Sequence, residues 1–381
     1  MRKLIKLETD KNVIFNQNIN EFISSDEIYI PIKSNYQLLV KIGEQVYKGQ
    51  IILENNLNKV ISPISGIVGN IDNKMVDGKL MRCLNIHNDY KERMKSLRHK
   101  EIKYTKDTLI SKLYENYFKY IANTLETKKI NNLIINGLDD EPYILNNSYI
   151  VNKYAKELLF MTDLLASTFS IDHPLIAIKN NQTNTIDKYI NRIGTYPKIN
   201  LAFIEDKYLL GNPFFLLEYL SLKESDSLVI DVKTLLNIYN AIKYNELTCN
   251  TFITISGPGA VRSQVLKVKI GATLKDIIQN NIKVRKGSVK YILNGLMTGY
   301  ECNIENTIVT NQTLGIIIIP DIDDEELPCN NCGLCYRICP VKINPKKAMD
   351  YHQPSKNCLD CGLCSYACPC HINLRKFLKE Q

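Results

Sequence analysis

Apolar residues follow three different spacings along the chain, and each spacing predicts a different kind of structure. Between about residue 28 and residue 88, short apolar runs are separated by Gly and Pro at intervals of roughly eight to twelve residues. Such spacing is typical of a small β-sandwich or barrel. We therefore expect an all-β domain over residues 1–95, with a hairpin tip near residues 55–58.

In the middle of the chain, the pattern alternates between helical and strand-like segments. Apolar side chains four residues apart predict one amphipathic helix over 109–125, and a second helix is expected at about 148–168. Short apolar runs predict buried strands at 133–135, 175–179, 200–204 and 228–231. Alternating strands and helices favour a parallel α/β layer over residues 100–245.

The pattern changes again after residue 248. Strands are predicted at 251–256, 264–270 and 291–293, with a short helix at 274–279. Hairpin, helix and strand in this order indicate a β-grasp-like domain over residues 248–320. Five acidic residues then occur within 321–326, which predicts a solvated linker before a cysteine-rich module at 327–381.

The composition is that of an ordinary soluble protein. Of 381 residues, 45% are hydrophobic and 23% are charged, so the chain can form several buried cores. No apolar run approaches the ~20 residues of a membrane span, and the N-terminus lacks the apolar stretch of a signal peptide. We expect a cytoplasmic protein, or one held peripherally at the cytoplasmic face of a membrane by partner subunits.

The strongest chemical signal is a duplicated cysteine motif. The spacing C-x2-C-x2-C-x3-C-P places four cysteines at Cys329, Cys332, Cys335 and Cys339, and repeats at Cys358, Cys361, Cys364 and Cys368. This is the spacing of bacterial ferredoxins that hold two [4Fe–4S] clusters, in which the fourth cysteine ligates the other cluster. Zinc and disulfides are the competing interpretations, but zinc knuckles need neither the third cysteine nor the trailing Pro.

The crossed ligation assigns every cysteine of the two motifs. The first cluster is expected to use Cys329, Cys332, Cys335 and Cys368. The second is expected to use Cys339, Cys358, Cys361 and Cys364. Cys370 is either a spare thiol or an alternative ligand, and the isolated Cys83, Cys249 and Cys302 are interpreted as core residues. We predict no catalytic residue and no other cofactor-binding residue.

Charge is concentrated around these motifs. The chain carries a formal net charge of +8, and residues 329–381 hold eight basic side chains against three acidic ones. A basic patch would steer an acidic ferredoxin, a flavodoxin or another protein of the same complex towards the clusters. Nucleic acid is the competing partner, but few aromatic residues are interleaved for base stacking, so we expect no nucleic-acid binding.

The order of these parts resembles a known family. The β-domain, with Gly43-Glu44-Gln45-Val46 and a Ser62 to Val68 run, looks like the barrel-sandwich fold of lipoyl domains, here without a modifiable lysine at the tip. The whole chain resembles the RnfC component of the Rnf electron-transport complex. Related proteins are the proline-reductase-associated electron-transfer protein and the cobalamin reductase of propanediol utilisation. The similarity includes Leu133 to Gly137 and the Thr254 to Gly257 opening of the third domain.

This resemblance implies a multidomain α+β fold: a lipoyl-like barrel-sandwich hybrid, a Rossmann-like α/β layer, a β-grasp domain of the SLBB type and a two-cluster ferredoxin module. Relatives that bind FMN and NADH carry a glycine-rich loop before the strand at 133–135. Here no glycine lies between Gly78 and Gly137, and the Glu-Cys-Glu-Pro turn is altered to Asp139-Asp140-Glu141-Pro142. Backbone N–H groups need such glycines to approach a phosphate, so FMN and NADH are not expected to bind.

The sequence is compatible with three functions. The first is an electron-transfer component of an oxidoreductase complex in anaerobic metabolism, without a substrate site of its own. The second is a flavin-dependent NADH oxidoreductase subunit, in which another loop, at 257–259 or 295–299, would hold the phosphate. The third is a non-redox module with structural metal.

Overall fold

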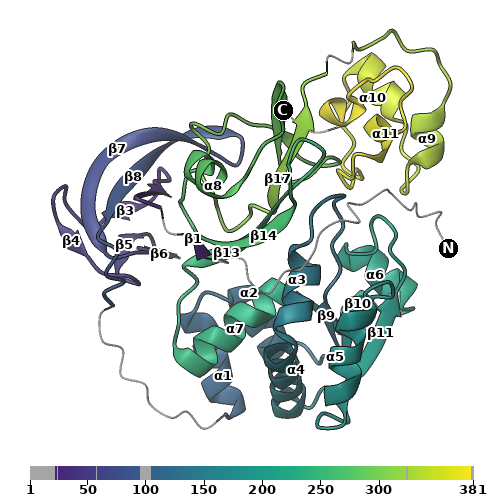
Figure 1. Cartoon of the computed structure of the whole chain (residues 1–381). Coiled ribbons are helices and arrows are strands. Elements are labelled where there is room, and N and C mark those ends of the chain that lie inside the picture. Colours follow the sequence, from purple (N-terminus) through teal and green to yellow (C-terminus); the bar gives the residue numbers. More distant parts are fainter. Residues whose placement is uncertain (1–21, 24, 57, 95–103, 323–324, 379–381) are drawn as a thin grey trace.

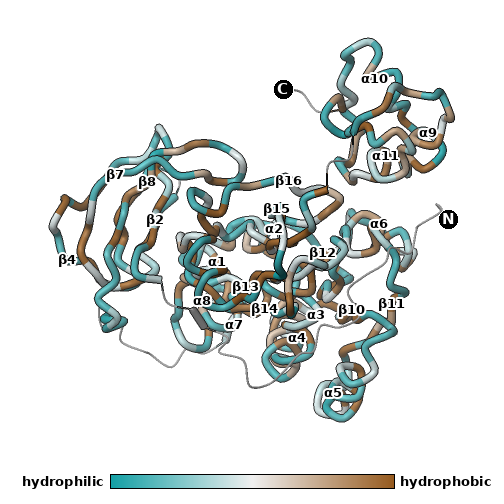
Figure 2. The backbone as a smooth tube through the Cα atoms, turned by 45° about the horizontal axis from the view of Figure 1, so that its top comes forward, coloured by the Kyte–Doolittle hydropathy of each residue, from teal (hydrophilic) through white to brown (hydrophobic). Residues whose placement is uncertain are grey.

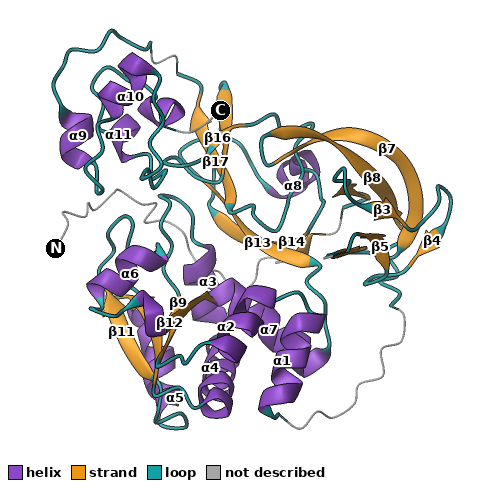
Figure 3. Ribbon diagram, turned by 180° about the vertical axis from the view of Figure 1, so that it is seen from behind, coloured by secondary structure: helices purple, strands orange, loops and turns teal. Residues whose placement is uncertain are grey.

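The computed structural model describes residues 22–23, 25–56, 58–94, 104–322 and 325–378. Figure 1 shows an N-terminal β region, a central α/β region, a region built on a mixed sheet, and the cysteine-rich segment in yellow at one end. Figure 3 shows the same layers from behind, with the helices of the α/β region gathered around its sheet. None of the described helices has the length and apolar character needed to cross a membrane.

The N-terminal region consists of two antiparallel sheets. One has the order β2-β8-β7-β4 and the other the order β3-β5-β6. Their strands are β2 (Glu27–Pro31), β3 (Gln37–Leu38), β4 (Gln45–Val46), β5 (Ile51–Glu54), β6 (Lys59–Ile61), β7 (Gly66–Val76) and β8 (Lys79–Asn88). The long β7–β8 hairpin turns at Asp77 and Gly78, both with positive φ, as a tight two-residue hairpin requires. The predicted hairpin tip lies between β5 and β6, where the Asn55 N–H donates to the Asn58 carbonyl at 2.9 Å.

The central region is built on a parallel four-stranded sheet with the order β11-β10-β9-β12. Its strands are β9 (Asn132–Asn136), β10 (His173–Lys179), β11 (Asn200–Ile204) and β12 (Ser227–Asp231). Its helices are α1 (Lys106–Glu115), α2 (Lys119–Thr127), α3 (Asn146–Lys153), α4 (Ala155–Phe169), α5 (Thr183–Ile193), α6 (Pro213–Tyr219) and α7 (Val232–Tyr244), with a 3₁₀ turn, η1 (Glu224–Asp226). Ligands of such sheets bind outside the carboxyl ends of the strands.

Two helix predictions and one strand prediction in this region were wrong. The helix predicted over 109–125 is two helices, because the chain turns at Tyr117 (φ 67°) after Asn116 has capped α1 with its N–H and side-chain amide. The helix predicted over 148–168 is likewise divided into α3 and α4 at Tyr154, whose ring packs edge-on against Phe252. Strand β11 is an edge strand that buries only Ile204, so it is not a buried strand.

The third region contains a mixed six-stranded sheet with the order β1-β14-β13-β17-β15-β16. Its elements are β1 (Phe22–Ile23), β13 (Asn250–Ser256), β14 (Gln264–Lys269), α8 (Leu274–Asn281), β15 (Val289–Leu293), β16 (Tyr300–Glu301) and β17 (Gly315–Pro320). Its core is continuous with that of the N-terminal region, since Ile28 and Ile86 belong to the same apolar cluster as Ile253 and Leu266. The two regions therefore pack as one body.

The cysteine-rich segment has only short helices. These are α9 (Leu334–Ile338), α10 (Pro345–Tyr351), α11 (Leu363–Tyr366) and the 3₁₀ turn η2 (Leu374–Phe377). Figures 1 and 2 both show this segment to one side of the molecule, with α9 farther from the other regions than α11. The two cysteine motifs thus have different surroundings.

Candidate metal centre

The two cysteine motifs repeat in backbone conformation as well as in sequence. Three pairs of residues with positive φ are spaced 29 positions apart: Asn331 and Asp360, Gly333 and Gly362, Lys342 and His371. The short helices α9 and α11 begin at the same offset. Left-handed conformations in close succession turn the backbone sharply, so each motif wraps its first three cysteines into one compact loop.

The structure brings together the four cysteines assigned to the second cluster. Cys339, Cys358, Cys361 and Cys364 all line one small cavity between the two motifs. Three of these cysteines come from the second motif and Cys339 comes from the first, as the crossed arrangement requires. The remaining wall is mostly apolar and includes Ile343, but the charged Asp360 and Arg375 also line it.

Backbone hydrogen bonds point at the sulfurs of this set. The Asp360 N–H donates to Sγ of Cys358 at 3.3 Å, and the backbone of Leu363 hydrogen-bonds to Cys361. Hydrogen bonds to a thiolate stabilise its charged form and tune the potential of a bound cluster. The loop therefore presents donors where negative charge on sulfur would develop.

The four cysteines assigned to the first cluster are more exposed. Cys329, Cys335 and Cys368 pack around the same small apolar cluster, whereas Cys332 is exposed. Backbone groups of Tyr336 and Lys346 hydrogen-bond to Cys335, which also feels the charges of Cys329 and Cys332. The structure thus places Cys335 near Cys329 and Cys332, with Cys332 on the solvent side. Cys368 lies against an apolar cluster that includes residues of both sets.

Burial decides the protonation of the free thiols. It raises the pKa of Cys335, Cys358 and Cys361, and it raises the pKa of Cys364 to about 12. Without metal these four side chains are neutral at pH 7. Binding iron or zinc would displace their protons, so affinity for metal should fall with falling pH.

The donor set fits an iron–sulfur cluster. Within the described ranges, no three His, Cys, Asp or Glu side chains are arranged to hold a single metal ion. A tetrahedral zinc site draws its sulfurs to about 2.3 Å from one ion, whereas a cubane receives each thiolate at a separate iron. Four thiols spaced around a common cavity, with amide donors beside them, match the second arrangement.

The remaining cysteines take no part in either set. Cys370 is buried in the module, and its carbonyl accepts a hydrogen bond from the Leu327 N–H at 3.0 Å. Cys83 and Cys249 are fully buried and Cys302 is half-buried. Burial raises the pKa of all three isolated thiols to about 11, which agrees with their interpretation as core residues.

The second motif forms a seam with two other regions of the chain. The Tyr208 hydroxyl, in the loop between β11 and α6, donates to the Cys361 carbonyl at 2.6 Å. Leu363 is buried against Tyr208, Phe215 and Met297. The site formed by the second cysteine set is therefore the inner one, enclosed by the α/β region and by the loop after β15.

Gly362 makes this close approach possible. A Cβ atom at this position would lie 2.0 Å from the carbonyl oxygen of Met297, and the residue has φ 73°. The matching Gly333 in the first motif has a similar φ of 69° but no atom within 4 Å of the corresponding position. The loop is thus packed against another region in the second motif and open to solvent in the first.

An ion pair within the module, together with one hydrogen bond, connects the second motif to the third region. Arg375, in η2, binds both carboxylate oxygens of Asp360, with Nη2 2.8 Å from Oδ2. Its Nη1 also donates to the Gly299 carbonyl at 3.3 Å. In the first motif the residue matching Asp360 is the neutral Asn331, so this clamp belongs to the inner site alone.

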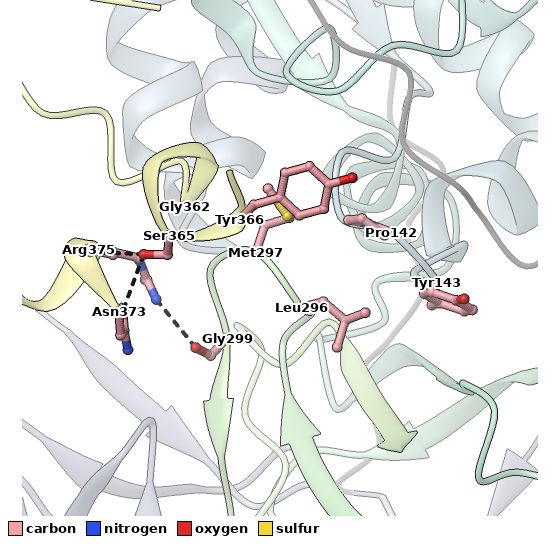
Figure 4. Close-up of a pocket in the computed structure, with 10 residues that line it drawn as sticks. All are labelled: Pro142, Tyr143, Leu296, Met297, Gly299, Gly362, Ser365, Tyr366, Asn373 and Arg375. Carbon is pink, nitrogen blue, oxygen red and sulfur yellow. Dashed lines mark hydrogen bonds between the residues drawn. The ribbon is translucent and has the colours of Figure 1, made fainter. Parts of the chain in front are cut away.

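A cavity of about 520 Å³ opens beside the inner site (Figure 4). Its lining comes from three parts of the chain: Pro142, Tyr143, Leu296, Met297, Gly299, Gly362, Ser365, Tyr366, Asn373 and Arg375. Gly362 and Arg375 line both this cavity and the cavity of the second cysteine set. Figure 4 shows Ser365, Asn373 and Arg375 at one end, with Leu296, Pro142 and Tyr143 at the other.

The acidic turn after β9 holds the regions together rather than lining the cavity. Asp139 accepts hydrogen bonds from the first amides of α3, at 2.7 Å from Asn147 and 3.0 Å from Ser148. Asp140 accepts from the Gly211 N–H at 2.7 Å. Burial raises the pKa of both carboxyls, that of Asp140 to about 6.

The third acid of this turn, Glu141, reaches into the third region. It accepts from the Met297 N–H at 3.0 Å and from the Thr298 hydroxyl. Burial raises its pKa, although these hydrogen bonds act in the opposite direction. All three acids of the altered turn are therefore engaged inside the protein.

Sequence reasoning missed the residues that distinguish the two motifs. Arg375, Tyr208 and Met297 lie outside the cysteine spacing, and only the fold brings them to Cys361 and Asp360. The available signal was that Asp360 stands where the first motif has the neutral Asn331. An acidic residue beside a cysteine ligand calls for a cationic partner elsewhere.

Two family models match parts of the chain. A model described as the RnfC barrel sandwich hybrid domain matches residues 1–91. A model described as the Nuo51 FMN-binding domain matches residues 114–242, which include the parallel sheet and the acidic turn. Since the second family is named for FMN binding, the expectation that no flavin binds to this chain is not established.

Curated relatives are similar along much of the chain. The C component of the ion-translocating oxidoreductase complex of Buchnera aphidicola is 24% identical, over 86% of this chain and 75% of its own length. The corresponding protein of Rhodobacter capsulatus is 26% identical, over 56% of this chain and 44% of its own length. The C component of the Na⁺-translocating ferredoxin:NAD⁺ oxidoreductase complex of Acetobacterium woodii is 22% identical, over 59% and 54%. The match thus spans about half the length of the last two relatives.

A solved structure shares the fold. A chain of an NAD⁺-reducing [NiFe]-hydrogenase in the air-oxidized state superposes with a TM-score of 0.53 at 12% identity, covering 72% of this chain and 63% of that one. An NAD⁺-reducing [NiFe]-hydrogenase in the H₂-reduced state gives 0.52. At this identity the similarity concerns the fold alone.

Proposed function

Because the chain belongs to an RnfC-like family, we propose that it is an electron-transfer subunit of a larger oxidoreductase complex. Its cysteine module, at residues 327–381, would hold two [4Fe–4S] clusters. Bound clusters of this kind supply one-electron transfer at low potential. We further propose that the remaining regions, at 1–95, 100–245 and 248–320, form the scaffold that positions this module.

One observation carries the proposal. Cys339 of the first motif lines the same cavity as Cys358, Cys361 and Cys364 of the second. The first set is proposed to comprise Cys329, Cys332, Cys335 and Cys368. Crossed ligation would hold the two clusters close together, which favours electron transfer between them.

The chain's own residues would do three things in this function. Thiolates hold iron, and backbone amides donate to them near Cys358 and Cys361. The Asp360–Arg375 pair keeps the inner loop against the third region. The apolar wall at Leu363 and Met297 excludes water from the inner site.

The proposal is tested by purification without oxygen. About eight irons and eight acid-labile sulfides per chain are expected, from two cubanes. Recovery of zinc in place of iron would overturn it. Co-purification from the native cell would then identify partners, which we propose are other subunits of the complex, a ferredoxin or a flavodoxin. A position at the cytoplasmic face of a membrane complex would follow from such partners.

A flavin-dependent NADH oxidoreductase is the second candidate. The match to an FMN-binding domain over 114–242 and the cavity beside the inner site favour it. Against it, the acids of the turn at 139–141 are engaged internally, and no glycine lies between Gly78 and Gly137. We therefore propose that electrons enter from a protein rather than from a nicotinamide.

A further inference from the structure

The two cysteine loops have the same backbone conformation, but the second loop is buried against other parts of the chain and the first is exposed. Leu363, in the second loop, is 3% exposed, whereas Leu334, which is 29 positions earlier in the first loop, is 38% exposed. Tyr336, on the same helix as Leu334, is 47% exposed. The two loops share their backbone conformation, but they differ in what lies against them and in the side chains at 336–338 and 365–367.

The chain itself shows how such a loop is covered. On the second loop, Tyr208, Phe215 and Met297 bury Leu363, and the Tyr208 hydroxyl donates to the Cys361 carbonyl. An aromatic and aliphatic surface with a hydroxyl donor is therefore a complementary partner for this loop shape. Nothing comparable covers the first loop within the described residues, and Figures 1 and 3 both show α9 on the outer side of the module.

Charge around the first loop selects the kind of partner. The described acidic residues of the module are already paired, Asp350 with Lys346 and Asp360 with Arg375. Among the described residues, Arg337 and Lys347 form no ion pair with a carboxylate, and both are exposed. The uncompensated charge of this face is positive, which attracts an acidic surface and repels a basic one.

From these observations we propose that the first loop, residues 329–338 with α9, is the docking surface for a small acidic electron-carrier protein. The carrier covers Leu334 and Tyr336 with an apolar patch at its own redox centre, and its acidic rim contacts Arg337 and Lys347. The inference rests on the proposed function. It assigns electron exchange to the outer cluster site, while the inner site faces the rest of the chain.

The test uses the full chain, purified anaerobically, and a small acidic ferredoxin as the probe. Isothermal titration calorimetry measures the dissociation constant of the complex between the chain and the ferredoxin, with both proteins oxidised. The second-order rate of cluster reduction is measured by stopped flow with the ferredoxin pre-reduced. Leu334→Glu and Arg337→Glu are each expected to raise the dissociation constant at least tenfold and to lower the rate to match. The effect of Arg337→Glu should shrink as salt rises, because screening weakens the attraction, whereas the loss of the apolar contact in Leu334→Glu should persist at high salt.

Matched controls separate docking from damage. Leu80→Glu places the same change on an exposed leucine of β8, and Lys156→Glu reverses an exposed charge on α4. Both controls should bind and react as the unaltered protein does. Iron content and reduction by dithionite should be unchanged in all four variants, which shows that the clusters are intact.

The outcomes are distinct. Full iron content with unaltered binding in Leu334→Glu and Arg337→Glu overturns the docking surface and leaves the proposed function standing. A protein without iron overturns the proposed function, and the docking surface with it. If Leu334→Glu instead dissociates a dimer in sedimentation experiments, a second copy of this chain covers the loop, and the proposal is wrong.

Discussion

Arg375 binds both carboxylate oxygens of Asp360 through Nε and Nη2, and its Nη1 donates to the Gly299 carbonyl of the neighbouring region. The Asp360 N–H donates in turn to Sγ of Cys358. A single chain of contacts therefore connects a proposed cluster ligand to the packing of the module. The charges of Arg375 and Asp360 should therefore affect both the reduction potential of a cluster at the inner site and the packing of the module against the third region.

Separate substitutions of Arg375 and Asp360 are predicted to shift the reduction potential of the inner cluster in opposite directions. Arg375→Gln removes a positive charge beside the inner site, which makes reduction harder and lowers the potential. Asp360→Asn removes a negative charge and raises it. Shifts on the order of tens of millivolts are expected, since about 59 mV corresponds to 1.4 kcal/mol for one electron. Redox titration followed by EPR measures both.

The first motif supplies the controls for this prediction. Asparagine already occupies the matching position at Asn331, so Asp360→Asn should be tolerated by the loop at its positive φ. Arg337→Gln alters a cation of the outer loop and should leave the inner potential unchanged. Shifts of the same sign in Arg375→Gln and Asp360→Asn would contradict an electrostatic origin.

If the fourth cysteine of each motif ligates the other cluster, its loss should damage the cluster of the other motif rather than that of its own. Cys368 belongs to the second motif, yet Cys368→Ala should damage the first cluster. Cys339→Ala should likewise damage the second, because Cys339 lines the cavity of the second set. Each variant should retain about four of eight irons. EPR spectra of the reduced variants should match those of Cys332→Ala and Cys361→Ala respectively, and the reverse matching would refute the crossed arrangement.

Two glycines with the same backbone conformation should differ sharply in their tolerance of a methyl group. Gly333→Ala meets open space, so its cost is the left-handed strain of about 1–2 kcal/mol. Gly362→Ala has the same strain and also collides with the Met297 carbonyl, which adds roughly 1–3 kcal/mol. Denaturant unfolding followed by circular dichroism compares the two. Equal losses would mean that the module does not pack against Met297 in solution.

Part of the fold and of the candidate site could be predicted from the sequence. The cysteine motifs, the strands at 133–135 and 228–231 and the β-rich first region were predictable, because their spacing reflects local geometry. The breaks at Tyr117 and Tyr154 were not, because the apolar period continues through both and only side-chain caps and tertiary contacts interrupt the helices. The matched leucines, Leu334 and Leu363, occupy equivalent sequence positions, so their unequal burial depends wholly on tertiary packing.

The buried acidic turn predicts a specific pH dependence. Burial raises the pKa of Asp140 from 3.8 to about 6, so the folded chain holds this proton more tightly than the unfolded chain does. The contribution of Asp140 to stability is therefore full below about pH 4 and is lost as the pH rises through 6. Asp140→Asn cannot titrate, and its amide oxygen can still accept from Gly211.

The stability of Asp140→Asn relative to the unaltered protein should consequently increase with pH. The difference in the free energy of unfolding should grow by roughly 2–3 kcal/mol between pH 4 and pH 8, as a shift of about two pKa units implies. Asp172→Asn, at an exposed position, serves as the control. If the difference in the free energy of unfolding does not change with pH, folding does not raise the pKa of Asp140, and the prediction is wrong.

The last prediction concerns flavin and nicotinamide. We expect the anaerobically purified chain to bind neither FMN nor NADH tightly, and NADH should not reduce its clusters. A phosphate needs several backbone donors at close range, which glycine permits because it lacks Cβ. Here the stretch before β9 is α1, a turn at Tyr117 and α2, and it contains no glycine. Titration with each cofactor, followed by fluorescence and by cluster absorbance, measures this directly.

A positive result would also show where the cofactor binds. The loop at 295–299 lines the cavity beside the inner site, but it follows strand β15 and is not the N-terminus of a helix. Leu296→Trp would fill part of this cavity from an exposed position. Stoichiometric flavin binding that Leu296→Trp abolishes, together with bleaching of the clusters by NADH, would make this chain an oxidoreductase with its own flavin. Flavin binding unaffected by Leu296→Trp would place the cofactor elsewhere on the α/β region and would equally refute the expectation.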